Sequence, residues 1–146
     1  MRAGASAPKM LLLALGLLFA MPMPARQRPL SQVQVARRFW LAAVGRQWEQ
    51  AYGWLTPAAQ AQLSARQFRQ ALQPLQEPVR RFGPVIDLYK LGYRLRDTAG
   101  PEPFVAYSFR TDTLAARPHF QLDVSFQDST ARQVKSFRLI RTNGDR

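Results

Sequence analysis

The sequence predicts an α+β domain in which N-terminal helices pack on a curved, four-stranded antiparallel sheet. Three observations lead to this class. Apolar residues recur with a helical period of about 3.6 before Gly83 and with a strand period of about 2 after it. Glycine- and proline-containing turns divide the second half into four segments. The connections between these segments are short enough for hairpins, which pair neighbouring strands antiparallel.

The N-terminal segment has the composition of a secretory signal peptide. Arg2 and Lys9 precede an apolar run over residues 10–21, which is shorter than the roughly 20 residues that a transmembrane helix needs. Small and helix-breaking residues follow the run. Residues 1–25 are therefore assigned to a signal peptide and residues 26–146 to a single domain. We expect an exported protein, periplasmic or secreted, without a stable transmembrane span; an uncleaved N-terminal anchor is the alternative.

The composition argues against several classes of function. The chain has no cysteine and one histidine, so thiolate chemistry is excluded and a metal site is not expected. Its 21 Lys and Arg outnumber 9 Asp and Glu, for a net charge of +12, but the basic residues are scattered along the chain. We therefore expect no nucleic-acid partner, and binding to anionic envelope polymers or lipid head groups stays open. Because no phosphate-binding loop or nucleophile-elbow motif is present, no cofactor is predicted.

Residues 31–46 predict the first helix. Ser31 and Gln34 match a capping box, in which the serine hydroxyl accepts a backbone N–H and the glutamine side chain reaches back to the cap. The apolar residues that follow fall on one arc of a helical wheel, as in a surface helix with one buried stripe. They are Val33, Ala36, Phe39, Trp40, Ala43 and Val44.

Further helical turns follow over residues 47–55. Thr56 is a favourable N-cap and Pro57 suits the first helical position, which together predict a short helix over residues 57–63. Another helix is expected to follow that one.

Ser64 and Gln67 form a second capping box, which begins this next helix. We expect Pro74 and Pro78 to end it. Its buried face is predicted to consist of Phe68, Ala71, Leu72 and Leu75.

Four segments show the strand pattern: residues 85–97, 104–114, 119–126 and 132–142. In the first, strict alternation predicts a basic face and an inward apolar face. The apolar face comprises Val85, Tyr89, Leu91, Tyr93 and Leu95.

The third and fourth strands differ in regularity. The third alternates most cleanly, with its apolar residues inward and its polar residues outward. The outward set is His119, Gln121, Asp123 and Ser125. In the fourth, Phe137, Leu139 and Ile140 interrupt the alternation, which predicts a β-bulge.

The layout resembles the nuclear-transport-factor-2-like superfamily over residues 31–142. The stretch "ARRFWLAAVGRQWEQAYGWLTPAAQAQLSARQFRQALQPL", followed by "FGPVIDL" and a strand meander, carries the resemblance. Within it, Tyr52, Leu55, Thr56 and Pro57 match the family's Y-x-x-L-(S/T)-P loop. The resemblance implies a cone with a long first helix and a bent sheet. Because its members include isomerases, dehydratases and transport factors, it implies a shape and leaves the function open.

Aromatic side chains at the expected mouth of the cone predict a ligand site. Their rings combine apolar area with a polar group, which suits a flat or lipid-like ligand. The candidates are Trp48, Tyr52, Trp54, Tyr89 and Tyr107. The main prediction is an exported, non-catalytic binding or interaction domain; the alternative is that these rings simply fill the core.

Asp87 is the candidate catalytic residue. Asp87 is two residues from both Val85 and Tyr89, so strand alternation places it on the predicted inward face. There it could act as a general base together with Tyr89 or Tyr52 in an isomerase- or dehydratase-type enzyme. The alternative is that Asp87 lies at the rim and pairs with an arginine.

The remaining titratable residues are interpreted as structural. Asp112 and Asp123 are expected to form cross-strand pairs with arginines on the solvated face, and His119 is expected to be exposed at a loop edge. The same face carries a set of arginines that would repel a second copy, so we expect a monomer or a weak dimer. These are Arg94, Arg96, Arg110 and Arg138.

Overall fold

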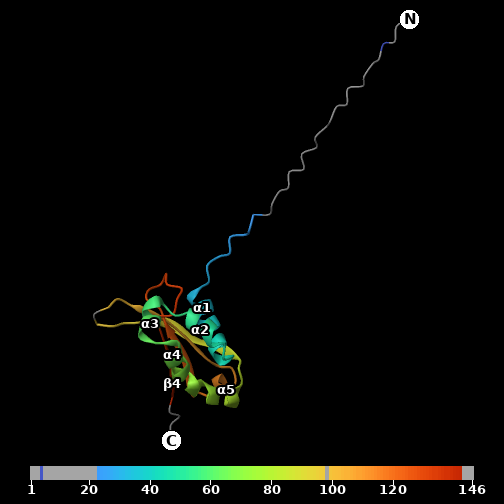
Figure 1. The fold of residues 1–146 in the computed structure, drawn as a ribbon. Helices are drawn as coiled ribbons and strands as arrows, with labels where there is room; N and C mark the ends of the chain where they lie inside the picture. The colour runs from blue at the N-terminus through green and yellow to red at the C-terminus, as the bar shows by residue number, and fades with distance from the viewer. Residues whose placement is uncertain (1–3, 5–22, 98, 143–146) are drawn as a thin grey trace.

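The computed structural model describes residues 4, 23–97 and 99–142, and this part of the chain holds helices followed by a four-stranded sheet (Figure 1). The α-helices are α1 (Gln32–Val44), α2 (Trp48–Gly53), α3 (Pro57–Gln62), α4 (Ala65–Ala71) and α5 (Gln76–Phe82). The strands are β1 (Ile86–Arg94), β2 (Glu102–Phe109), β3 (Phe120–Ser125) and β4 (Ser136–Arg141). Two short 3₁₀ turns are η1 (Gln73–Leu75) and η2 (Asp112–Leu114). The predicted α+β class is confirmed.

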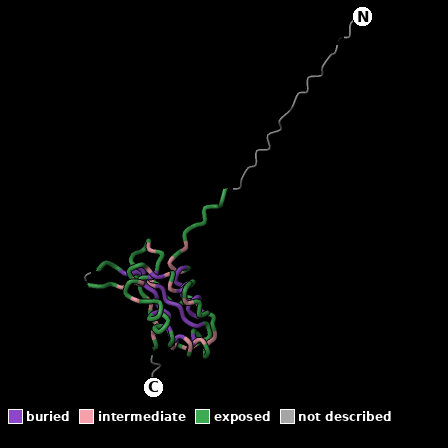
Figure 2. The backbone as a smooth tube through the Cα atoms, in the orientation of Figure 1, coloured by how far each residue is buried: buried purple, intermediate pink, exposed green. Residues whose placement is uncertain are grey.

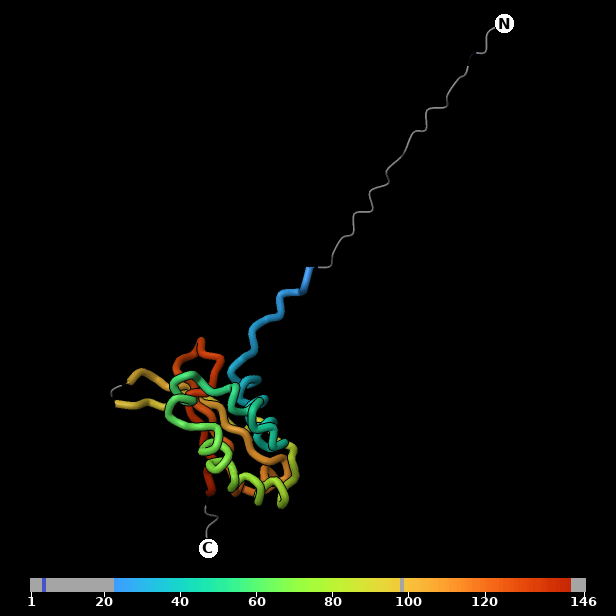
Figure 3. The backbone as a smooth tube through the Cα atoms, viewed as in Figure 1, coloured from blue at the N-terminus to red at the C-terminus, as the bar shows by residue number. Residues whose placement is uncertain are grey.

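The sheet is an antiparallel meander with the order β1-β2-β3-β4. One face packs under the helices: the hydroxyl of Tyr107 on β2 donates to the carbonyl of Val33 on α1 at 2.9 Å. The buried backbone lies in the centre of the domain (Figure 2). Residues 23–30 extend away from the domain before α1 begins (Figure 3).

The predicted helix caps are confirmed. The Ser31 hydroxyl accepts from the Gln34 backbone at 3.2 Å, and the Gln34 side chain accepts from the Ser31 backbone at 2.8 Å. Ser64 and Gln67 repeat this arrangement at the start of α4, and Thr56 caps α3. Each cap satisfies backbone donors that have no partner inside the helix.

The space between the helices and the sheet is filled with aromatic rings. The Phe39 ring lies 5.0 Å from that of Trp40, 6.1 Å from that of Phe68 and 5.4 Å from that of Phe137 on β4, between ring centroids. Most of the predicted stripe of α1 is buried in this core, but Val33 is only partly buried. The core therefore occupies much of the interior that a cone-shaped ligand site would need.

The helix that begins after Ser64 ends at Ala71, before Pro74, as expected, and separate helical turns then continue past both prolines. Pro74 lies in η1, and Pro78 is the third residue of α5. Only the role expected of Pro78 was wrong: it lies in the first turn of α5, where the N–H groups have no intrahelical acceptor, so a proline breaks no hydrogen bond. Helix α5 ends at Phe82, and its C-cap Gly83 has a φ of 83°, which favours glycine.

The bulge occurs in β1, at Tyr89, and not in β4. Leu88 pairs with Tyr107 and Lys90 with Ala106, so Tyr89 is the extra residue. An extra residue reverses the side to which the following residues point. Val85 and Leu91 therefore lie on opposite faces, and the prediction of one apolar face running through both was wrong. In β4 the pairing with β3 runs without a shift, so the bulge predicted there was also wrong.

Candidate functional site

A cavity of about 280 Å³ lies between the end of α1, the start of α2 and the η1–α5 segment. Its apolar surface comes from Ala43, Val44, Leu72, Leu75 and Val79. Its remaining lining comes from Arg46, Trp48, Gln76 and Arg80. We call it the Trp48 cavity.

A strained turn places the side chains of the Trp48 cavity. Arg46 follows the end of α1 with a φ of 58°, in the left-handed region that is unfavourable for a residue with a side chain. The backbone N–H of Gln47 donates to the carbonyl of Ala42 at 2.8 Å and holds this turn in place. The chain thereby reverses at the end of α1, so that both Arg46 and Trp48 border the cavity.

The lining combines an apolar floor with cationic edges. Leu72 and Leu75 are 1% and 2% exposed and form a rigid floor. Arg46 and Arg80 supply two guanidinium groups, and the lining contains no carboxylate. An adjoining hollow of about 420 Å³ shares Arg46 and Trp48 with the cavity, and its other lining residues include both Glu49 and Arg69. Such a site suits a ligand with an apolar body and an anionic end.

Of the five predicted aromatic residues, only Trp48 lines this cavity. The Tyr52 hydroxyl donates to the carbonyl of Leu63 at 2.8 Å, which ties α2 to the end of α3. Tyr107 is 2% exposed and is bonded to α1. For these two tyrosines the contacts match the alternative interpretation, in which the rings fill the core.

The other two predicted aromatic residues lie elsewhere. Trp54 packs partly buried against the core, and its carbonyl accepts from the backbone N–H of Val134 at 2.8 Å. Tyr89 is the bulged residue of β1 and is 43% exposed, with the Lys90 ammonium 5.4 Å from its ring centroid. Neither residue is among those that line the Trp48 cavity.

Asp87 forms a surface ion pair. Its carboxylate accepts from Arg110 Nε at 2.8 Å and from Arg110 Nη2 at 2.9 Å, and the Asp87 side chain is 40% exposed. The hydrogen bond from Arg110 holds the pKa of Asp87 below its ordinary value. A carboxylate with a lowered pKa is a weaker base. This arrangement matches the alternative interpretation, in which Asp87 lies at the rim and pairs with an arginine.

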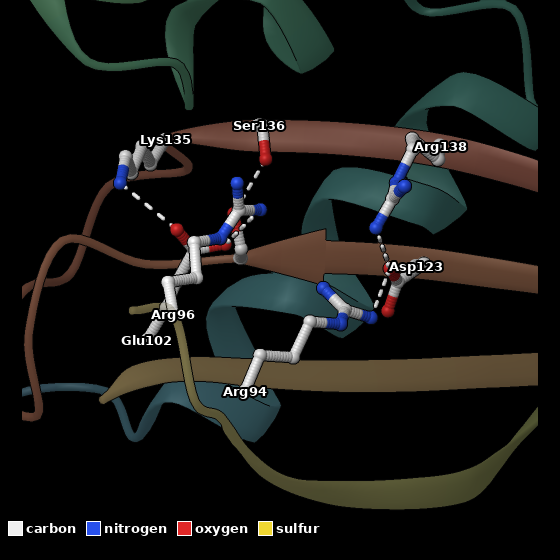
Figure 4. Close-up of polar contacts among 8 residues, drawn as sticks. Arg94, Arg96, Glu102, Asp123, Lys135, Ser136 and Arg138 are labelled. Carbon is white, nitrogen blue, oxygen red and sulfur yellow. Dashed lines mark hydrogen bonds and ion pairs between the residues drawn. The ribbon is translucent and has the colours of Figure 1, made fainter. Parts of the chain in front are cut away.

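The centre of the other sheet face is a buried charged network (Figure 4). Arg94 Nη2 lies 2.5 Å from Asp123 Oδ2, and Arg138 Nη2 lies 3.7 Å from it on the opposite side (Figure 4). The Arg94 guanidinium also lies over the Phe104 ring, 4.3 Å from its centroid. Asp123 was expected to be solvated, but it is only 2% exposed because the edge-strand arginines lie over it.

Glu102 forms a second charged cluster on this face, and it was missed in the sequence. Its carboxylate accepts from Lys135 Nζ at 2.9 Å and lies 3.4 Å from Arg96 Nη2. Burial alone would raise the pKa of Glu102, but hydrogen bonds from Lys135 and Ser125 outweigh it and leave the pKa below its ordinary value. The sequence held no signal for it, because its partners Arg96 and Lys135 reach it from the turn after β1 and the segment before β4.

Asp112 and His119 join the two ends of the loop between β2 and β3. Asp112 Oδ1 lies 2.7 Å from His119 Nδ1, and Asp112 Oδ2 accepts from the backbone of Phe120 at 2.9 Å. The expectation of a solvated pair with an arginine was wrong for Asp112, which is 1% exposed and holds this loop closed. His119 is a half-exposed residue at the loop edge, stacked near Phe82.

The sequence contained a signal for the Trp48 cavity that was not used. Phe68, Leu72, Leu75 and Val79 keep helical spacing through both prolines, and the last three line the cavity. The position of Arg46 had no comparable signal, because its left-handed backbone depends on the packing of the turn.

Among residues 23–97 and 99–142, no cluster of three metal-ligating side chains is found, nor any helix with the length and apolarity to cross a bilayer. The assigned signal peptide over residues 1–25 lies almost wholly outside the described residues. Comparisons with models of protein families, with curated protein sequences and with solved structures find no match to this chain.

Proposed function

We propose that this protein is an exported, non-catalytic binding domain that holds a small amphipathic anion in the Trp48 cavity. The observation that carries the proposal is the lining: an apolar floor, an aromatic wall and two arginines, with no carboxylate among them. Export is inferred from the signal-peptide pattern of the first 25 residues.

The charge and size of the site define the ligand class. Two guanidinium groups favour a carboxylate or phosphate head, since arginine donates paired, charge-assisted hydrogen bonds to such groups. The net charge of +12 adds a long-range attraction for anions. A volume of about 280 Å³ is at the small end of ligand pockets. A short acyl chain or a single-ring aromatic acid fits this description.

The enzyme alternative has less support. Asp87 is the only candidate base, and it is exposed and paired with Arg110, which lowers its pKa. A general base benefits from a pKa raised toward the working pH, the opposite of this environment. Binding without chemistry is therefore the function that we favour.

We further infer membership of the nuclear-transport-factor-2-like superfamily and a monomeric or weakly dimeric state. The order of helices followed by an antiparallel meander supports the first inference. Repulsion between the arginines of the sheet face supports the monomeric or weakly dimeric state less strongly than the sequence alone suggested. In the structure each of these arginines has a carboxylate partner. The pairs are Arg94–Asp123, Arg96–Glu102, Arg110–Asp87 and Arg138–Asp123.

Ligand titration with matched probes tests the proposal. Octanoate and phenylacetate should bind saturably, and octanol, which lacks the charge, should bind more weakly. Replacing both cavity arginines (Arg46→Gln and Arg80→Gln) should weaken octanoate binding about tenfold and leave octanol binding unchanged. Trp48→Leu should weaken both.

Arg66→Gln, on the exposed side of α4, is the matched control for lost charge. The proposal fails if octanoate does not saturate the protein, or if the cavity variants and the control bind it equally well.

A further inference from the structure

Strand β1 forms an open edge of the sheet. It has a neighbour on one side only. Most of the exposed large hydrophobic residues in the described part of the chain lie on it or beside it. They are Val85 (46% exposed), Leu88 (45%), Tyr89 (43%), Leu91 (58%), Tyr93 (61%) and Leu95 (86%). Exposed apolar residues gathered on one strand mark an interaction surface more often than scattered ones do.

The bulge at Tyr89 divides this edge into two parts. After it, Leu91 and Tyr93 point to the helix side of the sheet, because Leu91 pairs with Val105, a core residue. Beside them lies a hollow of about 210 Å³, which Val33 at the start of α1 also lines. We call Lys90–Leu95 together with this hollow the β1 edge. It offers alternate apolar side chains and main-chain groups that no strand of the described sheet pairs.

The charge of the β1 edge selects its occupant. Lys90 lies on it and Arg132 lines the hollow, and within the described residues neither forms an ion pair. The carboxylates nearest in the sheet, Glu102 and Asp123, are already bound to basic side chains. Arg132 also lies near the Asp128 carboxylate, so the positive charge that an incoming segment meets is mainly that of Lys90, which attracts acidic residues.

The same charge disfavours a second copy of this chain. Antiparallel pairing of two β1 strands about Gly92 places Lys90 opposite Arg94, and pairing about Tyr93 places Lys90 opposite Arg96. Like charges directly opposite one another destabilise a strand pair. A partner with a different sequence avoids this repulsion.

We propose that the β1 edge binds an extended segment of a partner protein in which apolar and acidic residues alternate, and that this segment adds a strand to the sheet. Its main chain pairs with the outer N–H and C=O groups of β1 beyond the bulge. Its apolar side chains contact Leu91 and Tyr93, and its carboxylates face the side of Lys90. This inference does not depend on a ligand in the Trp48 cavity.

Fluorescence anisotropy with short labelled peptides tests the pairing. A peptide alternating valine and glutamate should bind saturably and more weakly as salt is added. Its valine–lysine counterpart should bind at least about tenfold more weakly, and so should a valine–glutamate peptide N-methylated at alternate residues, which cannot donate the ladder hydrogen bonds. Hydrogen exchange should slow at residues 90–95 on binding.

Variants locate the site. Tyr93→Ser should weaken binding of the valine–glutamate peptide about tenfold. Lys90→Glu should weaken it too and should strengthen binding of the valine–lysine peptide. Leu114→Ser, at a position that is 86% exposed on η2, should change nothing and controls for lost surface hydrophobicity. Urea unfolding curves should show that all three variants are folded.

Several results would overturn the proposal. Equal binding of the N-methylated peptide would indicate an apolar patch without strand addition. A dimer in sedimentation that Tyr93→Ser abolishes would assign the edge to a second copy of the chain. Binding to anionic vesicles with no binding to the valine–glutamate peptide would assign it to a lipid surface. Peptide binding that none of the β1 variants alters would place the contact elsewhere.

Discussion

The two edge strands of the sheet have similar sequences and different surroundings. On β4, Phe137 and Leu139 point under the helices and pack against the core, where the Phe137 ring lies 5.3 Å from that of Phe68. On β1, Leu91 and Tyr93 point to the same side of the sheet and are 58% and 61% exposed. Both strands direct apolar residues to this side, but those of β4 are partly buried and those of β1 are mostly exposed.

The difference arises from where the connecting segments run. Residues before β4 pair with the segment after α2: the Thr56 backbone donates to the carbonyl of Val134 at 3.0 Å, next to the bridge between Leu55 and Val134. This contact anchors the helices over the β4 side of the sheet. The alternation of a strand thus predicts that one face is apolar, but other segments decide whether that face is buried.

Truncating one aromatic residue on each edge strand should show the largest difference in stability between them. Phe137→Ala should lower the free energy of unfolding by about 3 kcal/mol, because it opens a cavity between the rings of Phe39, Trp40 and Phe68. Tyr93→Ala should change it by less than about 0.5 kcal/mol, as is usual for exposed positions. Urea denaturation of both variants measures the contrast. Equal losses would mean that β1 is covered like β4.

The arginines of both edges meet at Asp123, which gives a second, smaller test. Asp123→Asn should cost about 2 kcal/mol, because it leaves two guanidinium groups without their buried counter-charge. Arg94→Met should cost more than Arg138→Met, since Arg94 is the closer and less exposed partner, with 25% of its side chain exposed against 59%. The reverse order in denaturation experiments would contradict the network in Figure 4.

The smallest expected effect is the pH dependence contributed by Glu102, whose carboxylate is bonded to Lys135. The pKa of Glu102 is lower in the folded protein than its ordinary value. Its stabilising contribution is therefore present above the pKa of the unfolded chain and is lost as the pH falls through the folded pKa. Lys135→Met should reduce this loss, because it removes a hydrogen bond that lowers the pKa. Urea midpoints from neutral pH down to about pH 3 would measure it. An unchanged acid profile would count against the Lys135 contact.

Much of the fold was predictable because its signals are local. Ser31, Thr56 and Ser64 satisfy backbone donors within the next turn, so the caps needed no knowledge of distant contacts. The strand order followed from short loops. The errors came from single residues that change a local rule: Pro78, tolerated in a first helical turn, and Tyr89, which reverses the faces of β1.

The candidate sites were less predictable, because they depend on contacts between distant segments. Trp48 was predicted to be a ligand contact and lines the cavity, but Arg46 and Arg80 join it there only through a left-handed turn and the succession of η1 and α5 after α4. Asp123 was foreseen as an arginine partner, but its burial depends on side chains reaching it from β1 and β4. Sequence periodicity assigns residues to faces, and tertiary contacts set their exposure.

Thiol labelling of single-cysteine variants tests the contrast between the two edges most directly, because the natural chain has no cysteine to interfere. Tyr93→Cys on β1 should react with a maleimide in the folded protein nearly as fast as in the urea-unfolded chain. Leu139→Cys on β4 should react slowly until the protein unfolds, because helices cover that side of the strand. Equal protection of the two thiols, or faster labelling on β4, would contradict the account of one open and one covered edge.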